Sequence, residues 1–496
     1  MFTNKKHSII FKVNKQGRLL RRYLNTRDNN EIVNIKEAII NGLAKDGGLY
    51  VPEHINKIDD IYKLKDYSYQ ELATFILNQF IDYDISEYVN KAYNNNFDNK
   101  NICPVKKVAN NYFLELFHGS TSAFKDVALQ LLPYILTSSS NDDKDIVILS
   151  ATSGDTGKAA LEGFKDVAKT RITILYPNKM VSKVQERQMT TTKGNNTDVI
   201  AINGNFDDCQ SMVKDILENH KSDKIHLTSA NSINIARLLP QIVYYFSAYF
   251  ELLNNSEITK DELLDYYVPT GNFGDILAGY IAKEMGLPIN KLICASNANN
   301  VLTDFINTGT YDINRDFINT MEPSIDILIS SNLERLLYLK SKDTNLIKDL
   351  MSSLKTNKKY TIPNSILTSI QEDFVGIYAS EEEVKEAIKE VYEKDHYLID
   401  PHTAVAYIAS KKYDTKHKKV ILATASPYKF SKDVYKCLTN EDIVDNLEAI
   451  ETLENYTSIE APSNLKELKD LPIRFREVFN LSDKDLLINK LEKNND

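Results

Sequence analysis

The sequence has few of the features by which several common classes of protein are identified. Its 496 residues include only four cysteines, and no two of these stand at the spacing of metal ligands. They are Cys103, Cys209, Cys294 and Cys437. We interpret them as reduced thiols in a cytosol-like compartment. The eight histidines include no His-Glu-x-x-His pattern, so we expect no metal site.

Long apolar runs and an excess of positive charge are also missing. No apolar stretch approaches the roughly 20 residues that a membrane span requires. The formal net charge is -9, whereas a nucleic-acid-binding surface needs basic residues to neutralise phosphates. We therefore expect a cytoplasmic protein, monomeric or homodimeric, without nucleic-acid or membrane partners. A small anionic ligand is still possible, because local sites can be positive in an acidic protein.

The N-terminus is strongly basic. Residues 1–22 contain eight Lys, Arg or His residues and no acid, which is compatible with a short organellar presequence or with a solvated extension. Because the segment lacks a clear amphipathic period and a cleavage signal, we favour the basic extension.

The remaining chain has the composition of a globular protein, with 42% hydrophobic and 26% charged residues. The part up to about residue 98 is helical and loop-rich in pattern, with apolar residues at helical spacing in 34–43 and 69–85. From Asp145 onward, short apolar runs alternate with amphipathic segments. This alternation predicts an α/β fold in which mostly parallel sheets are covered by helices on both faces.

Two series of elements are expected in this region. The first has strands at 145–150, 172–176, 198–202 and 225–227, and helices at 158–169, 185–192 and 207–219. The second has helices at 235–253 and 276–285, and strands at 266–268, 291–295 and 420–424. Ser380 and Glu383 form the pattern of a capping box that opens a helix. Beyond residue 440 we expect a peripheral helical tail.

Lys125 is the residue around which the chain is organised in our interpretation. It follows a loop of small hydroxyl residues, Gly119 to Ser122, and precedes an apolar helical run. An amine in an apolar setting has a lowered pKa and can attack a carbonyl. Alone, the signal is weak, because a lysine in the first turn of a helix is usually a surface residue.

Two strand-loop-helix junctions strengthen the signal. In residues 150–157 and 269–275, backbone N–H groups and hydroxyls are expected to converge on the positive end of a helix, where an anion binds. The first loop lacks the four-residue gap and the hydroxyl after lysine of a Walker A motif, and the second is Gly-x-x-Gly rather than Gly-x-Gly-x-x-Gly. Each loop alone could be a generic turn of an α/β fold.

Together these motifs resemble the fold-type II enzymes that depend on pyridoxal 5'-phosphate (PLP) and, within them, the threonine synthase family of the longer bacterial and fungal type. The resemblance rests on blocks at 26–27, 42–52, 117–126, 150–157, 228–240, 271–275, 321–335, 400–404 and 423–430, in the order of the family. It implies a fold like that of the tryptophan synthase β subunit, with two parallel-sheet domains and a helical N-terminal domain. The expected division is a basic extension 1–22, an N-terminal domain 23–110, a small α/β domain with the PLP lysine 111–235, a large PLP-binding α/β domain 236–438 and a C-terminal helical tail 439–496.

The resemblance also implies roles for individual residues. Lys125 would hold PLP as a Schiff base, and Thr424 would hydrogen-bond the pyridine nitrogen. The cofactor phosphate would lie in a cradle formed by Gly271, Asn272, Phe273, Gly274 and Asp275. The charged ends of the substrate, O-phospho-L-homoserine, would be held by Ser153, Asp155 and Thr156, with Lys179, Arg187, Asn231 and Arg237 as candidates for its phosphate and carboxylate. A basic residue on a helix is, however, more often surface decoration than a ligand.

Three serines depart from the family pattern. Ser120 and Ser122 stand where the family often has proline and leucine, and Ser426 stands where it often has histidine. We expect the first two to soften the loop before Lys125. The third puts in doubt any proton-transfer role that the family assigns to that position.

The expected reaction converts O-phospho-L-homoserine and water to L-threonine and phosphate, with Lys125 taking the Cα proton. One alternative is a lyase of the same fold that eliminates phosphate and releases 2-oxobutyrate and ammonia. Such a lyase would share Lys125, both loops and Thr424, but we would not expect it to have the N-terminal domain. A second alternative is a non-catalytic metabolite-binding protein, although that role would not require the amine of Lys125.

Overall fold

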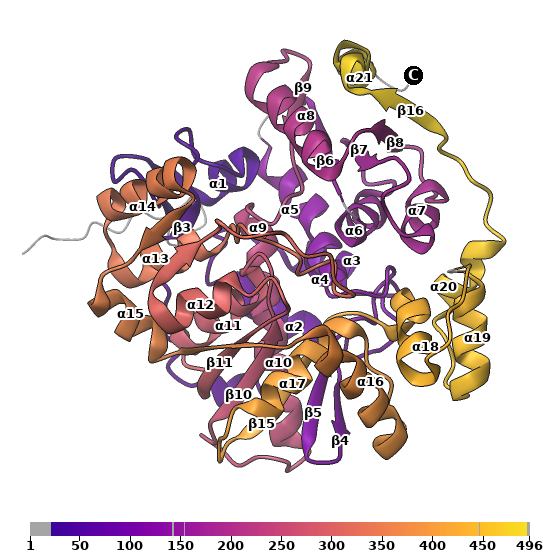
Figure 1. Ribbon diagram of the computed structural model, residues 1–496. Coiled ribbons are helices and arrows are strands. Elements are labelled where there is room, and N and C mark those ends of the chain that lie inside the picture. Colours follow the sequence, from indigo (N-terminus) through magenta and orange to yellow (C-terminus); the bar gives the residue numbers. More distant parts are fainter. Residues whose placement is uncertain (1–20, 141–142, 153, 446, 494–496) are drawn as a thin grey trace, which may run out of the picture.

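The computed structural model describes residues 21–140, 143–152, 154–445 and 447–493. Two mainly parallel sheets with covering helices form most of these residues (Figure 1). The α/β architecture expected from the alternating pattern is therefore confirmed. The basic extension expected at 1–22 lies, except for its last two residues, outside the described residues.

The larger sheet has six strands in the order β14-β11-β10-β15-β5-β4. The strands are β4 (Val105–Val108), β5 (Asn111–Glu115), β10 (Leu264–Pro269), β11 (Ile289–Ser296), β14 (Phe374–Tyr378) and β15 (Lys418–Ala423). All neighbouring pairs are parallel except β4 and β5, which pair antiparallel. The sheet thus draws its strands from segments far apart in the sequence.

Alternate residues of these strands face two different cores, as the period of a strand requires. Tyr266 and Val268 belong to a cluster that includes α10 (Gln241–Asn254) and α11 (Gly274–Glu284). Tyr267 belongs to a second cluster with α16 (Glu381–Asp395) and α17 (Pro401–Lys412). Helices therefore cover both faces, which explains why β10 is buried along its whole length.

The smaller sheet has five parallel strands in the order β16-β8-β7-β6-β9. They are β6 (Asp145–Ala151), β7 (Thr170–Pro177), β8 (Thr197–Asn203), β9 (Ile225–Thr228) and β16 (Glu477–Asn480). One face packs on α6 (Asp155–Phe164), and the other packs on α8 (Phe206–Asn219) and α21 (Lys484–Glu492). The tail that we expected to be helical therefore also supplies an edge strand.

The N-terminal part is not only helical. Its strands β1 (Arg22–Asn25), β2 (Ile32–Asn34) and β3 (Tyr50–Pro52) form an antiparallel sheet in the order β2-β1-β3. The helices beside it are α1 (Ile35–Asn41), α2 (Tyr69–Leu77) and α3 (Ser86–Ala92). The helical pattern expected for 69–85 therefore covers only α2, and the rest is loop.

The remaining elements connect these layers. They are α4 (Lys125–Leu129), α5 (Leu132–Ser139), α7 (Lys183–Thr190), α9 (Ile235–Leu238), α12 (Val301–Thr308), α13 (Leu333–Ser341), α14 (Thr344–Asn357), α15 (Asn364–Gln371), α18 (Ser431–Thr439), α19 (Glu448–Thr457), α20 (Ser463–Lys466), β12 (Thr310–Asp312) and β13 (Lys359–Thr361). The single helix expected at 235–253 is wrong, because two helices, α9 and α10, separate at Pro240, whose ring does not fit a helix interior. The capping box of Ser380 and Glu383 is confirmed. No helix in the described ranges is long and apolar enough to cross a membrane.

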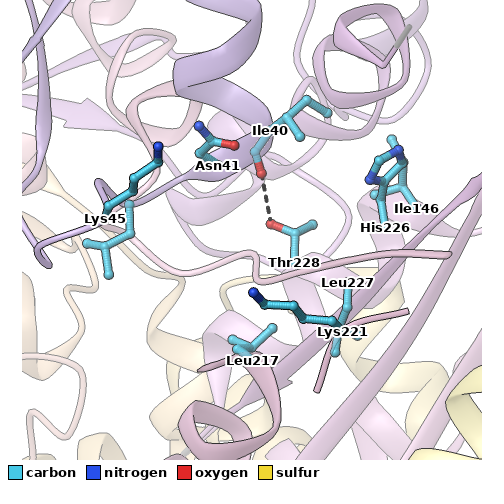
Figure 2. Close-up of a pocket in the computed structure, with 10 residues that line it drawn as sticks. Ile40, Asn41, Lys45, Ile146, Leu217, Lys221, His226, Leu227 and Thr228 are labelled. Atoms are coloured by element: carbon cyan, nitrogen blue, oxygen red, sulfur yellow. Dashed lines mark hydrogen bonds between the residues drawn. The ribbon is translucent and has the colours of Figure 1, made fainter. Parts of the chain in front are cut away.

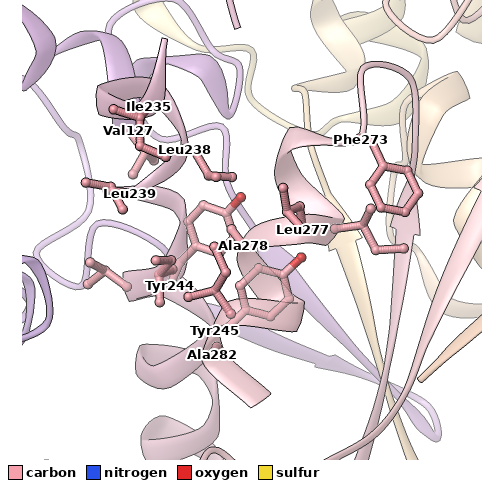
Figure 3. Packing of buried hydrophobic residues seen from close by; sticks show 14 of the residues in the cluster. Val127, Ile235, Leu238, Leu239, Tyr244, Tyr245, Phe273, Leu277, Ala278 and Ala282 are labelled. Atoms are coloured by element: carbon pink, nitrogen blue, oxygen red, sulfur yellow. The ribbon is translucent and has the colours of Figure 1, made fainter. Parts of the chain in front are cut away.

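A shared hydrophobic core supports the elements that carry the predicted site. Figure 3 shows Val127 of α4 packed near Ile235 and Leu239, while Tyr244 and Tyr245 of α10 lie beside α11. The same core fixes α4, which begins at Lys125, and α11, which begins at the glycine loop. The core therefore sets the relative position of the lysine and that loop.

Candidate active site

Lys125 is the first residue of α4, and its loop runs beside the segment that follows β15. The backbone N–H of Phe124 donates to the carbonyl of Thr424 at 2.8 Å, and the N–H of Ser426 donates to the carbonyl of Ser122 at 3.0 Å. Strands β5 and β15 are neighbours, so the segments leaving their carboxyl ends stay together. The backbone of Thr424 is therefore bonded to that of Phe124, the residue directly before Lys125.

The amine of Lys125 has an unusual environment. Burial lowers its pKa to about 8, Asp155 opposes this shift, and the nearby cations Arg237 and Lys429 add to it. Among the described residues the amine has no hydrogen-bond or ion-pair partner, and it lies 5.9 Å from the ring centre of Phe124. A substantial neutral fraction near pH 8 makes this amine a nucleophile.

Asp155 is the anion whose charge acts on this amine, and Lys429 forms an ion pair with it. The Nζ of Lys429 lies 3.0 Å from Oδ1 of Asp155 and also donates to the carbonyl of Thr121 at 2.8 Å. Both side chains are buried. Burial alone would raise the pKa of Asp155, but the charges of Lys429 and Lys125 and the hydrogen bond from Lys429 hold that pKa well below its usual range.

Two further groups orient Asp155. Gln185 of α7 donates to its Oδ1 at 3.3 Å, and the hydroxyl of Ser324 donates to its Oδ2 at 3.2 Å. The backbone N–H of Ser324 in turn donates to Nε2 of His402 at 3.2 Å, while Nδ1 of His402 lies 2.7 Å from Asp400. With Nε2 as an acceptor, Nδ1 carries the proton of a neutral imidazole. The carboxylate of Asp155 is therefore held in position and stays ionised.

The loop from Gly271 to Gly274 forms an anion-binding nest at the start of α11. Phe273 adopts the left-handed conformation with φ 63°. The backbone N–H groups from Gly271 to Ile276 have no acceptor among the described residues. At a helix N-terminus such donors favour a phosphate. A Cβ on Gly271 would lie only 3.1 Å from the carbonyl of Ser324, so a larger residue would crowd the nest.

The neighbouring chain holds this loop from behind. The side chain of Ser330 donates to the carbonyl of Gly271 at 2.7 Å, and the N–H of Asn332 donates to the carbonyl of Asn272 at 3.0 Å. Arg335, which is fully buried, hydrogen-bonds Asn332 and donates to the carbonyl of Tyr50 at 2.9 Å. The carbonyls thus point away from the nest, which leaves its N–H groups available.

The carboxylate of Asp275 is hydrogen-bonded to neighbouring tyrosines and is not free to act in the nest. Both Tyr244 and Tyr245 donate hydrogen bonds to its Oδ1. Burial raises its pKa to about 6, although the two tyrosine hydroxyls oppose the shift. Since a carboxylate would repel a phosphate, the group of Asp275 that suits the nest is its backbone N–H.

Thr424 and Arg237 offer unused donors near Lys125. The hydroxyl of Thr424 has no hydrogen-bond partner among the described residues, although the residue is buried. Arg237 donates to the carbonyl of Ala230 at 2.7 Å, its Nε is buried without a partner, and no carboxylate pairs with it in the described ranges. Burial lowers the pKa of Arg237 to about 10. An unpaired buried guanidinium is costly, which makes Arg237 a receptor for an anion.

Other residues expected at the site have different surroundings. Asn231 accepts a hydrogen bond from Ser150 at 3.0 Å, and Thr156 is partly buried at the start of α6. Lys179 is exposed. Arg187 donates to the carbonyls of Leu468, Lys469 and Leu471, an arrangement that favours a structural role over substrate binding. Ser153 lies outside the described residues.

The loop at 150–157 is less open to an anion than its sequence suggests. The hydroxyl of Thr152 accepts hydrogen bonds from the N–H groups of Gly154 and Gly157, at 2.9 and 3.0 Å. The carboxylate of Asp155 lies in the same first turn. Two donors are therefore used internally, and among the described residues of this loop the backbone N–H groups of Asp155 and Thr156 are left without an acceptor.

A separate cavity of about 490 Å³ lies between α1 and β9 (Figure 2). Ile40 and Asn41 line it on one side, and His226 and Thr228 on the other. The hydroxyl of Thr228 donates to the carbonyl of Ile40 at 3.5 Å. None of the residues expected to bind cofactor or substrate lines this cavity.

Three families match successive and partly overlapping parts of the chain. Residues 22–93 match the family described as "Threonine synthase N terminus", residues 106–426 match "Pyridoxal-phosphate dependent enzyme", and residues 403–486 match "Threonine synthase, C-terminal". The second match includes Lys125, the glycine loop and Thr424. The fold and this site define a PLP-dependent enzyme of fold type II.

Similarity to individual proteins extends over nearly the whole chain. Threonine synthase of Saccharomyces cerevisiae is 37% identical over 95% of this chain and 97% of its own length. Threonine synthase of Pseudomonas aeruginosa is 39% identical over 84% of this chain and 90% of its own. PLP-bound threonine synthase from Brucella melitensis has a structure that matches with a TM-score of 0.85 at 37% identity, over 95% of this chain and 99% of that one. The chain belongs to the threonine synthase family.

Four residues around Asp155 were not expected from the sequence. Lys429, Gln185 and Ser324 contact Asp155 directly, and His402 contacts it through Ser324. Lys429, His402 and Ser324 lie inside blocks that resemble the family, but no local pattern shows that a lysine at position 429 reaches an aspartate at position 155. Only the fold supplies that contact.

Proposed function

We propose that this chain converts O-phospho-L-homoserine and water to L-threonine and phosphate with PLP as cofactor. The observation that carries the proposal is the presence of two separate groups of anion-binding donors around one amine of lowered pKa. The nest at Gly271–Gly274 suits the cofactor phosphate, and the unpaired Arg237 suits an anionic group of the substrate. A substrate that itself carries phosphate requires its own anion-binding donors in addition to the nest that suits the cofactor phosphate.

When bound, PLP supplies an electron sink for the charge that develops at the substrate Cα. Lys125 would hold the cofactor and, as a free amine, would take the proton from Cα, because its pKa of about 8 suits a general base near neutral pH. The hydroxyl of Thr424 would hydrogen-bond the pyridine nitrogen; the backbone bond between Thr424 and Phe124, the residue before Lys125, supports this role. A neutral hydroxyl there does not force a charge on the ring.

Asp155 and Arg237 divide the substrate's charges between them. The carboxylate of Asp155 stays ionised beside Lys429 and suits a cationic group, whereas Arg237 suits the carboxylate or the phosphate. With these ends fixed, the overall reaction requires loss of phosphate from Cγ and addition of the water oxygen at Cβ. Burial of the network limits competing access of water.

The first test is replacement of Lys125. We expect Lys125→Ala to lose the absorption of lysine-bound PLP and to lower kcat by at least about a hundredfold, the low end of the usual contribution of a general base. Lys348→Ala is a suitable control, because Lys348 lies exposed on α14 and has no role in the site. Persistence of the lysine-bound absorption in Lys125→Ala would assign the Schiff base to another residue.

The second test identifies the reaction by its products. The wild-type enzyme supplied with O-phospho-L-homoserine should release equal amounts of threonine and phosphate. Formation of 2-oxobutyrate and ammonia in place of threonine would refute the synthase and support the lyase alternative.

A further inference from the structure

A segment of the C-terminal region, residues 462–471, lies against the loop that precedes Lys125. It contains α20 and a short 3-10 helix, Glu467–Lys469. Nδ2 of Asn464 donates to the carbonyl of Ser120 at 2.9 Å and to the hydroxyl of Ser122 at 3.0 Å, and Oδ1 of Asn464 lies 3.2 Å from the same hydroxyl. One side chain therefore contacts two residues of the lysine loop.

The loop at this point has a backbone conformation that needs support. Ser122 has φ 58°, in the left-handed region that residues other than glycine rarely adopt. Asn464 contacts the loop at Ser122 itself and at Ser120, two residues before it. Ser120 and Ser122 are also the two residues that depart from the family pattern. The contact of its hydroxyl with Asn464 gives the departure at Ser122 a structural explanation, whereas the hydroxyl of Ser120 accepts a hydrogen bond from Gln130 at 2.9 Å.

The other end of the same segment is fixed to α7. Arg187 donates to the carbonyls of Leu468, Lys469 and Leu471 at 2.8, 3.0 and 2.7 Å. Helix α7 also carries Gln185, whose side chain donates to Asp155. Segment 462–471 thus connects the helix beside Asp155 with the loop beside Lys125, and these two belong to different sheets.

We propose that Asn464 is a positioning residue for Lys125, and that segment 462–471, clamped by Arg187, fixes the separation of Lys125 and Asp155. The inference rests on the proposed function, because it takes Lys125 as the catalytic amine. Asp155, Arg237 and Lys429 are the charges that act on this amine. A shift of the lysine loop therefore changes both the direction of the amine and its ionisation.

Asn464→Ala tests the proposal on the holoenzyme. Loss of two hydrogen bonds should lower kcat by about tenfold and leave KM within about twofold. The absorption of lysine-bound PLP should titrate at a different pH from the wild type. Asn455→Ala is the matched control, since Asn455 lies exposed on α19 in the same tail and its side chain has no hydrogen bond among the described residues. It should behave as the wild type.

Two further variants separate positioning from folding. Asn464→Asp keeps an acceptor for the Ser122 hydroxyl and loses the donor to Ser120, so it should fall between the wild type and Asn464→Ala. In a double-mutant cycle, Asn464→Ala and Ser122→Ala should be less than additive in kcat, because they remove a common contact.

Several outcomes would overturn the proposal. It fails if Asn464→Ala matches Asn455→Ala in kcat and in the titration, or if its lost activity returns fully at a temperature where it is folded. Additive effects of Asn464→Ala and Ser122→Ala would also contradict it. Failure of the proposed function is distinguishable, because it shows in the products of the wild type. The titration of lysine-bound PLP in the variants does not depend on which product forms.

Discussion

Lys429 joins Asp155 to the loop that precedes Lys125. Its Nζ binds both Asp155 and the carbonyl of Thr121, and its side chain is 1% exposed. A buried carboxylate without its cation would be strongly destabilised, by about 3–5 kcal/mol. Lys429 therefore keeps Asp155 charged and ties it to the lysine loop.

Lys429→Met tests this role through the pH dependence of activity. In the wild type the pKa of Asp155 is depressed, so its carboxylate stays ionised as the pH falls. Without Lys429, burial raises that pKa, and the acid limb of the kcat/KM profile should move to higher pH. The melting temperature should also fall. Both are measured on the purified holoenzyme.

The control is Lys436→Met, which removes an exposed ion pair with Asp442. Such surface pairs contribute about 0–1 kcal/mol, so the acid limb should stay in place. An unshifted limb in a folded Lys429→Met enzyme would show that Asp155 does not need this cation.

The sequence predicted residues whose signal is local and missed those whose role depends on distant contacts. Lys125 and the loop at Gly271–Gly274 are marked by neighbouring residues, so their positions at helix starts could be inferred. Lys429 and Asn464 act on residues more than 270 and 340 positions away. Arg187 is the opposite case. The sequence suggested it as a candidate for binding the substrate, but its hydrogen-bond partners in the structure are backbone carbonyls of the C-terminal tail.

The glycine loop at the start of α11, residues 271–274, has little space for larger side chains at one of its two glycines. The two glycines of this loop differ, because a Cβ on Gly271 would lie 3.1 Å from the carbonyl of Ser324, whereas one on Gly274 would lie 3.5 Å from the amide of Asn332. The first distance requires backbone to move, and the second is ordinary van der Waals contact. The space around each glycine therefore predicts how it tolerates substitution.

We expect Gly271→Ala to weaken PLP binding by about tenfold, because overpacking typically costs about 1–3 kcal/mol. Gly274→Ala, the matched variant, should have a smaller effect. The measurement is titration of the apoenzyme with PLP, followed by the absorption of the bound cofactor. Equal losses in both variants would contradict the steric explanation.

Elements with strong periodicity were predicted well, and their boundaries less well. The strands of the smaller sheet from β6 to β9 were all expected, because their apolar runs are bounded by loops. Strand β16 was missed, since four residues with only Phe479 buried carry little pattern. The break at Pro240 was missed because the apolar pattern continues on both sides of it.

At the scale of the whole molecule, the C-terminal tail completes the smaller sheet. Strand β16 pairs with β8, and α21 buries Leu487 against the same sheet. The adjacent Leu486 is 57% exposed. The tail is therefore part of the folded core of this sheet rather than a peripheral addition.

A pair of neighbouring leucines tests this conclusion. Leu487→Ala should destabilise the protein by about 2–5 kcal/mol, whereas Leu486→Ala should change stability by less than about 0.5 kcal/mol. Thermal unfolding gives the difference, and hydrogen exchange should quicken in β8 before β10. If the two variants melt together, the tail does not contribute to the core.

The position of β15 has a consequence for how the molecule assembles. This strand, at residues 418–423, lies between β10 and β5. Until it is in place, the hairpin of β4 and β5 has no neighbour in the larger sheet, and Thr424 cannot reach the loop of Lys125. On a ribosome that makes the chain from its N-terminus, Lys125 is synthesised early, but Thr424 is added only about 300 residues later. The enzyme can therefore bind PLP only late in its synthesis, when its smaller sheet still awaits β16.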